Sequence, residues 1–194
     1  MSPRSNLTKQ TVVQAAADLI NVEGLDALSL GRLAEKLGIR TPSLYNHVDG
    51  LPGLFRELSV LNARNLAERI NEAAIGQSGP GAVRAVMQAM RSYIKEYPGL
   101  YLSTLRASGT QAEVDPELEM EEARSVKVGM AVMASFGLEG EDAVHALRGL
   151  RSLVHGFATL EISGGFGMPL ELDESFSRLV DLFIAGLEGQ KLDG

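Results

Sequence analysis

Side chains that can hydrogen-bond to nucleic acid gather between residues 40 and 47. They are Arg40, Thr41, Ser43, Tyr45, Asn46 and His47. Guanidinium, hydroxyl, amide and imidazole groups bond to base edges and phosphates, and a tyrosine ring also packs on thymine methyl groups or sugars. The stretch therefore predicts contact with a duplex. The competing interpretation is that Tyr45 and His47 only pack the core of a small helical corner.

Catalytic chemistry has no comparable set of residues. The histidines His47, His145 and His155 lack metal-ligand spacing, and the chain has no cysteine, no nucleophile motif and no glycine-rich phosphate loop. A helical enzyme is the rival interpretation that these absences disfavour. We expect no catalytic site, no metal and no cofactor.

Two short helices and a turn are predicted to position the polar stretch. Ser29 is a helix N-cap residue, Gly38 suits the positive φ of a tight turn, and Thr41 with Pro42 is predicted to cap and begin the second helix. Buried contacts are expected from Leu30, Leu33, Leu37, Ile39, Leu44 and Val48. This arrangement is a helix-turn-helix.

Helical periodicity extends along the whole chain. Apolar residues recur at steps of three and four, as in the segment 173–189, for which Asp173 is a natural N-cap. No alternating strand pattern occurs. We predict an all-α fold of about nine helices, with a three-helix DNA-binding domain at residues 1–50 and a larger regulatory and dimerisation domain at residues 51–194.

The charge distribution neither excludes a nucleic-acid partner nor argues for one. The net charge is −7, but residues 1–50 hold five basic and five acidic side chains, so the acidic excess lies in residues 51–194. A neutral module can approach a polyanion while a distant acidic region is screened. The polar start, the absence of cysteine and the lack of an apolar run of roughly 18 residues predict a cytoplasmic protein without membrane contact.

The stretch LSLGRLAEKLGIRTPSLYNHVDGLPGLF resembles the N-terminal domain of the tetracycline-repressor (TetR/AcrR) family of bacterial transcriptional regulators. The resemblance places the polar stretch on the recognition helix and Ser29 and Arg32 at the sugar-phosphate backbone, with Arg4 and Lys9 as further arm contacts. It implies a homodimer, formed through helices at about 141–163 and 173–189, that represses from a palindromic operator until a small-molecule effector releases it.

One position departs from the family pattern. Family members usually carry a phosphate-binding lysine at the start of the fourth helix, where this chain has Leu51. Loss of that contact leaves open a helical adaptor that binds only protein. The segment RSLVHGFATLEISGGFGMPLELDESF also resembles the C-terminal domain of a TetR subgroup named for a Trp-His-Gly motif, matching His155 and Gly156 without the tryptophan.

Soft and aromatic side chains of the middle helices are candidates for an effector site, although each is equally an ordinary core residue. The candidate ligand-binding residues are Met90, Tyr93, Tyr97, Tyr101, Met130, Met133, His155 and Glu161. Glu161 falls inside an apolar helix face, so it must be paired, lie near a capped helix end or face a cavity. The simplest account is a frayed last turn with Glu161 in water. For Gly156, a close helix crossing is expected to offset its low helix propensity.

Overall fold

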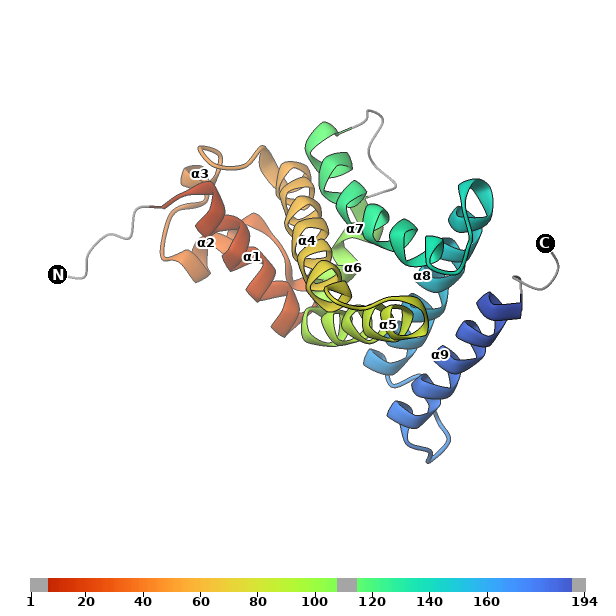
Figure 1. The fold of residues 1–194 in the computed structure, drawn as a ribbon. Coiled ribbons are helices and arrows are strands. Elements are labelled where there is room, and N and C mark those ends of the chain that lie inside the picture. Colours follow the sequence, from red (N-terminus) through yellow and green to blue (C-terminus); the bar gives the residue numbers. More distant parts are fainter. Residues whose placement is uncertain (1–6, 108–114, 190–194) are drawn as a thin grey trace. The chain divides into compact units, whose positions relative to one another are not determined.

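A computed structural model describes residues 7–107 and 115–189 of the chain (Figure 1). These residues form nine α-helices and one 3-10 turn, with no strand among them, which confirms the predicted all-α class. The chain divides into two compact units. The first unit comprises Met1–Ala63 with Tyr97–Glu119, and the second comprises Arg64–Glu96 with Met120–Gly194. The sequence predicted a DNA-binding domain at residues 1–50 and a regulatory domain at residues 51–194. That division is by function, so it stays a prediction.

The first unit packs the predicted helix-turn-helix against neighbouring helices. Its elements are α1 (Lys9–Glu23), η1 (Leu25–Ala27), α2 (Leu30–Leu37), α3 (Thr41–Leu44), the first part of α4 (Gly50–Ala74), α6 (Pro98–Ala107) and the start of α7 (Pro116–Ala134). All six apolar residues predicted to join the short helices contact one core, which also includes Val12, Leu58 and Leu100.

Local capping explains where these helices begin and end. The Ser29 hydroxyl accepts a hydrogen bond from the Arg32 backbone N–H, as predicted for an N-cap. At the other end of α2, Gly38 has φ 66° and its N–H donates to the Glu35 carbonyl, while the Ile39 N–H donates to the Ala34 carbonyl. This pair of bonds is a Schellman motif, so the predicted turn at Gly38 is confirmed.

Two predicted caps are wrong. Helix α3 already includes Thr41, so Arg40 occupies the N-cap position, and no side chain caps this helix. Helix α9 (Leu172–Gly189) likewise begins before Asp173, whose carboxylate pairs with Arg91 instead of capping. A recognition helix was expected to reach His47, but α3 ends at Leu44 and a turn carries residues 45–47.

Close backbone approach joins α6 to α1 in the first unit. A Cβ atom built on Gly99 would lie 2.1 Å from the Ile20 carbonyl oxygen, so only glycine fits there. Next to this contact the Leu100 backbone N–H donates to Asn21 Oδ1 at 2.9 Å. Helix α6 therefore belongs to the core that holds the helix-turn-helix, although it is distant in sequence.

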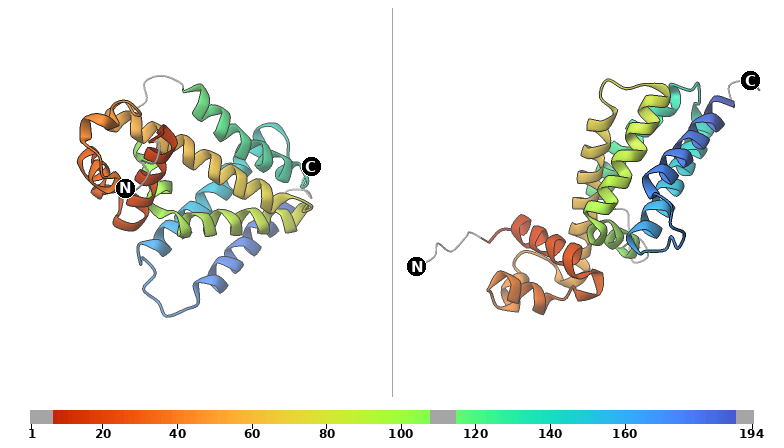
Figure 2. Two further views of the ribbon diagram at one scale, coloured as in Figure 1. Left: turned by 90° about the vertical axis from the view of Figure 1, so that its left-hand side faces the viewer. Right: turned by 90° about the horizontal axis from the view of Figure 1, so that it is seen from below.

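The second unit is a helical bundle. It contains the rest of α4 and α7, together with α5 (Gly79–Glu96), α8 (Gly140–Ile162) and α9. Helix α5 packs against both α8 and α9, which also contact each other (Figure 2). The bounds of α8 and α9 confirm the two final helices expected from the sequence. No helix in the described ranges is long and apolar enough to cross a membrane.

Candidate nucleic-acid interface and effector region

The residues predicted to contact DNA lie at the surface of the first unit. Ser29, Arg32, Arg40, Tyr45 and Asn46 are exposed. The remaining three, Thr41, Ser43 and His47, are half-buried. The set therefore lies on α2 and α3, at the N-cap residue of each helix and in the turn after α3, over a common core.

Tyr45 is the clearest of these surface residues. Its side chain is 59% exposed although tyrosine usually buries much of its ring, and it is not part of the first unit's core. The interpretation that Tyr45 only packs the core is therefore wrong. A Cβ on Gly50 would lie 4.0 Å from its Cε1 atom, so the ring stands beside the start of α4.

Ion pairs decide which cations are available to phosphate. Arg32, predicted to contact the backbone, pairs with Glu23, and Lys9 pairs with Glu57 at 3.0 Å. Among the described residues, Lys36 and Arg40 are exposed cations of the first unit without an ion pair. Arg4 lies outside the described residues. The interface thus has fewer free positive charges than its count of basic residues implies.

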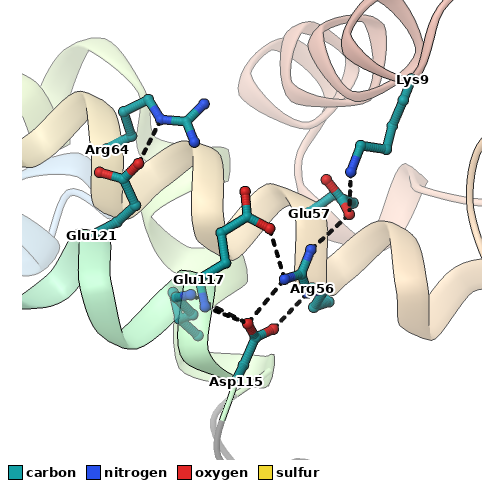
Figure 3. Close-up of polar contacts among 8 residues, drawn as sticks. Lys9, Arg56, Glu57, Arg64, Asp115, Glu117 and Glu121 are labelled. Atoms are coloured by element: carbon teal, nitrogen blue, oxygen red, sulfur yellow. Dashed lines mark hydrogen bonds and ion pairs between the residues drawn. The ribbon is translucent and has the colours of Figure 1, made fainter.

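A charged cluster fastens the start of α4 to neighbouring elements of the first unit (Figure 3). Arg56 donates to Glu57 and Glu117 at 2.8 Å and to Asp115 Oδ1 at 2.9 Å. The bond to Asp115 raises the pKa of Arg56 above its ordinary value against the opposing effect of burial. The same bond lowers the pKa of Asp115, which also caps α7 by accepting from the backbone N–H groups of Glu117 and Leu118. The cluster therefore joins α4 to the first turn of α7.

Glu161 is paired and withdrawn from water. Its carboxylate accepts two hydrogen bonds from Arg91, both at 2.8 Å, and pairs with Lys95 at 2.6 Å. The side chain is 9% exposed, so the expectation of a frayed turn in water is wrong. Burial alone would raise the pKa of Glu161, but the hydrogen bonds from Arg91 and Lys95 lower it below its ordinary value.

Arg91 is the centre of this arrangement and was not singled out in the sequence. It is 2% exposed, and its guanidinium carbon lies 5.3 Å from the Phe157 ring centroid and 4.8 Å from that of Phe176. Glu161 and Asp173 supply the compensating charge. A buried arginine between two rings and two carboxylates fixes α5 to α8 and α9.

The other predicted effector residues do not share one site in the described chain. Met90, Tyr93 and Met133 are core residues of the second unit, and Met130 and His155 are half-buried there. Tyr97 and Tyr101 belong to the first unit. The expected close crossing at Gly156 is absent in the described chain, because an added Cβ would meet nothing within 4 Å.

A cavity of about 530 Å³ lies elsewhere in the second unit, at the ends of α4 and α7 and the start of α5. Its lining residues are Ala67, Asn71, Ala74, Ile75, Gln77, Ser78, Ala82, Arg124, Lys127, Val128, Ala131, Val132 and Ser135. None of them was predicted as a ligand residue. The sequence signal that could have indicated this cavity is the row of small and β-branched residues on one face of α7. The row comprises Val128, Ala131 and Val132 and follows the cations Arg124 and Lys127.

The chain is similar in sequence and fold to known transcriptional regulators. A family model described as "Tetracyclin repressor-like, C-terminal domain" matches residues 83–183. The uncharacterized HTH-type transcriptional regulator YobS of Bacillus subtilis is 33% identical over 188 residues, 96% of each chain. The uncharacterized regulator Rv0681 of Mycobacterium tuberculosis is 32% identical over 190 residues, 98% of this chain and 86% of that one. The crystal structure of TetR from Acinetobacter baumannii AYE shares the fold, with a TM-score of 0.71 at 23% identity over 96% of this chain and 99% of that one. The chain belongs to the TetR family of helix-turn-helix transcriptional regulators.

Proposed function

We propose that the protein is a homodimeric repressor that binds a palindromic operator and is released by a small-molecule effector. The observation that carries the proposal is the exposed polar surface around α3, above all Tyr45, on a helix-turn-helix fixed by the Ser29 cap and the Gly38 turn. Arg40, Thr41, Ser43, Asn46 and His47 complete the surface proposed to enter a major groove.

Exposed apolar side chains on α8 and α9 support the dimer. Leu160 on α8 is 48% exposed, and Leu182 on α9 is 72% exposed. Gly156 also lies on α8, and a Cβ atom added to it would have no neighbour within 4 Å. Two such pairs related by a two-fold axis would bury these residues in a four-helix interface. A symmetric dimer would then read both halves of a palindrome.

Helix α7 offers a route from effector to DNA. Asp115 at its start and Glu117 in its first turn bind Arg56, while its last turns line the cavity. A ligand that shifts this one helix would alter the Arg56 cluster. A coupling of about 1–3 kcal/mol is typical of such regulation and is enough to lower operator occupancy.

The test is duplex binding by fluorescence anisotropy, using the best duplex recovered from a random pool. We expect Tyr45→Ala/His47→Ala to weaken binding by tenfold or more, because each base contact contributes about 1–3 kcal/mol. Val22→Ala is the matched control, since Val22 is 84% exposed at the end of α1. Equal affinity of all three proteins would favour the protein-binding adaptor.

A further inference from the structure

The cavity in the second unit combines an apolar floor with a positively charged rim. Ala67, Ala82 and Val132 line it and are at most 6% exposed, so its apolar side lies against the core of the second unit. The charged residues that line it are Arg124 and Lys127, and no carboxylate does. The lining is therefore positively charged, although the chain as a whole has a net charge of −7.

The two cations at the rim differ in their ion pairs. Glu121, 4% exposed, accepts a hydrogen bond from Arg64 and another from Arg124, both at 2.8 Å (Figure 3 shows the bond from Arg64). Burial alone would raise the pKa of Glu121, but the bonds from Arg124 and Arg64 lower it. Arg124 therefore shares the Glu121 carboxylate with Arg64. Lys127 is exposed and makes no ion pair within the described ranges.

Hydrogen bonds between the Ser135 side chain and the backbone fix the cavity wall. The Ser135 hydroxyl accepts from the Gly79 backbone N–H at 3.1 Å and donates to the Val132 carbonyl at 2.6 Å. The bond from Gly79 ties the first residue of α5 to the end of α7. The cavity is therefore a preformed feature of the second unit, and its volume lies within the range of about 300–1,000 Å³ for small-molecule sites.

We infer that this cavity binds a small amphipathic anion, whose apolar chain lies on the alanine and valine wall and whose anionic head meets Lys127 and Arg124. A guanidinium has five N–H donors, so Arg124 can bind an anion while it keeps its bond to Glu121. The inference deepens the proposed function by naming the class of effector, and its regulatory consequence rests on that function.

The probe is octanoate, titrated into the full-length protein without DNA in a calorimeter, with octan-1-ol as the neutral compound of equal chain length. We expect octanoate to bind and octan-1-ol to bind at least tenfold more weakly. Lys127→Gln should weaken octanoate binding by about three- to tenfold, as for loss of a partly exposed charge pair. Ala131→Phe, at an exposed lining position, should abolish binding by filling the cavity.

Arg178→Gln is the matched control, because Arg178 is a 76% exposed cation on α9 that does not line the cavity. It should bind octanoate like the unaltered protein, and a thermal melt of each variant checks folding. Equal binding of octanoate and octan-1-ol, no effect of Lys127→Gln and Ala131→Phe, or no octanoate binding at all would each overturn the inference.

Operator binding is measured separately on the same proteins. Specific DNA binding without octanoate binding would overturn the anion site and leave the repressor proposal standing. Octanoate binding without specific DNA binding would support the anion site and contradict the repressor. The two proposals therefore fail in distinguishable ways.

Discussion

Arg91 on α5 and Glu161 on α8 form a double hydrogen bond, Nε to Oε2 and Nη2 to Oε1, both at 2.8 Å. Their side chains are 2% and 9% exposed, so the pair belongs to the interior of the second unit. Asp173 on α9 pairs with the same guanidinium, but its own side chain is 87% exposed. The two carboxylates thus differ sharply in how much the fold depends on them.

Glu161→Gln should lower the free energy of unfolding by about 3–5 kcal/mol, because it leaves Arg91 buried without its main counter-charge. Asp173→Asn is the matched control and should cost at most about 1 kcal/mol, because water screens the 87% exposed carboxylate of Asp173. Urea unfolding at one fixed protein concentration measures both. Equal losses for the two variants would show that Glu161 is not the dominant partner.

Stability should fall in acid through the buried glutamates. The hydrogen bonds that outweigh burial at Glu161 and Glu121 lower their folded pKa below the ordinary value of 4.5. The unfolded chain therefore binds more protons near that pH. The contribution is complete above about pH 4.5 and is lost as pH falls through the folded pKa values.

The free energy of unfolding between pH 7 and pH 3 measures this loss. Glu161→Gln should show a smaller decrease than the unaltered protein, since it no longer has the titrating group. Glu188→Gln, at an exposed position of α9, is the control for removal of one surface charge. A decrease as steep in Glu161→Gln as in the control would contradict the assignment.

Gly99→Ala should destabilise the first unit by about 1–3 kcal/mol, because the new Cβ would lie 2.1 Å from the Ile20 carbonyl oxygen and force α6 away from α1. Gly31→Ala is the contrasting variant. Gly31 lies on α2, and its added Cβ would meet only the Ser29 hydroxyl oxygen at 3.9 Å, so a gain of about 0.5–1 kcal/mol is expected. Thermal unfolding of the pair checks both signs. An unchanged Gly99→Ala protein would mean that the α1–α6 contact is looser than described.

Leu51→Lys should steepen the salt dependence of DNA binding. Leu51 packs partly against the first unit's core, and a lysine stem can follow the same apolar surface while its ammonium reaches a phosphate. One added phosphate contact increases the slope of log affinity against log salt by about 0.9 per subunit. Leu51→Met is the uncharged control. Identical slopes for the lysine and methionine variants would place residue 51 away from the DNA backbone.

Glu23→Gln should strengthen DNA binding at low salt, because it frees Arg32 from its ion pair and leaves the arginine available to phosphate. Anisotropy with scrambled duplex isolates this non-specific gain, which we expect to be about two- to fivefold and to shrink as salt screens it. Gln10→Ala, an exposed change on α1, serves as the control. No gain at low salt would indicate that Arg32 does not approach the backbone.

Local signals in the sequence predicted the helix-turn-helix well. The Ser29 cap and the Gly38 turn each involve hydrogen bonds to residues only a few positions away. Residue type alone therefore predicts them. Thr41 and Asp173 are not N-caps, because residue type alone does not determine where a helix begins. Each is a good capping residue, but α3 begins at Thr41 itself and α9 begins one residue before Asp173. Asp173 pairs instead with Arg91 from another helix.

Contacts between helices that are distant in sequence could not be predicted. The apolar surroundings of Glu161 required a partner, yet nothing local points to Arg91, which is 70 positions away. The contact at Gly99 depends on the path of α1, and the cavity depends on three helix ends that meet only in the fold. A helical wheel shows the face of one helix and not what lies against it.

The most direct test of the central claim is a selection from random duplex DNA with the purified protein, followed by affinity for the enriched and a scrambled sequence at two salt concentrations. The proposed repressor predicts an enriched palindrome, bound at least a thousandfold more tightly than scrambled DNA, as is typical of specific regulators. No enrichment, with equally weak binding of both duplexes, would contradict specific operator recognition by the free protein.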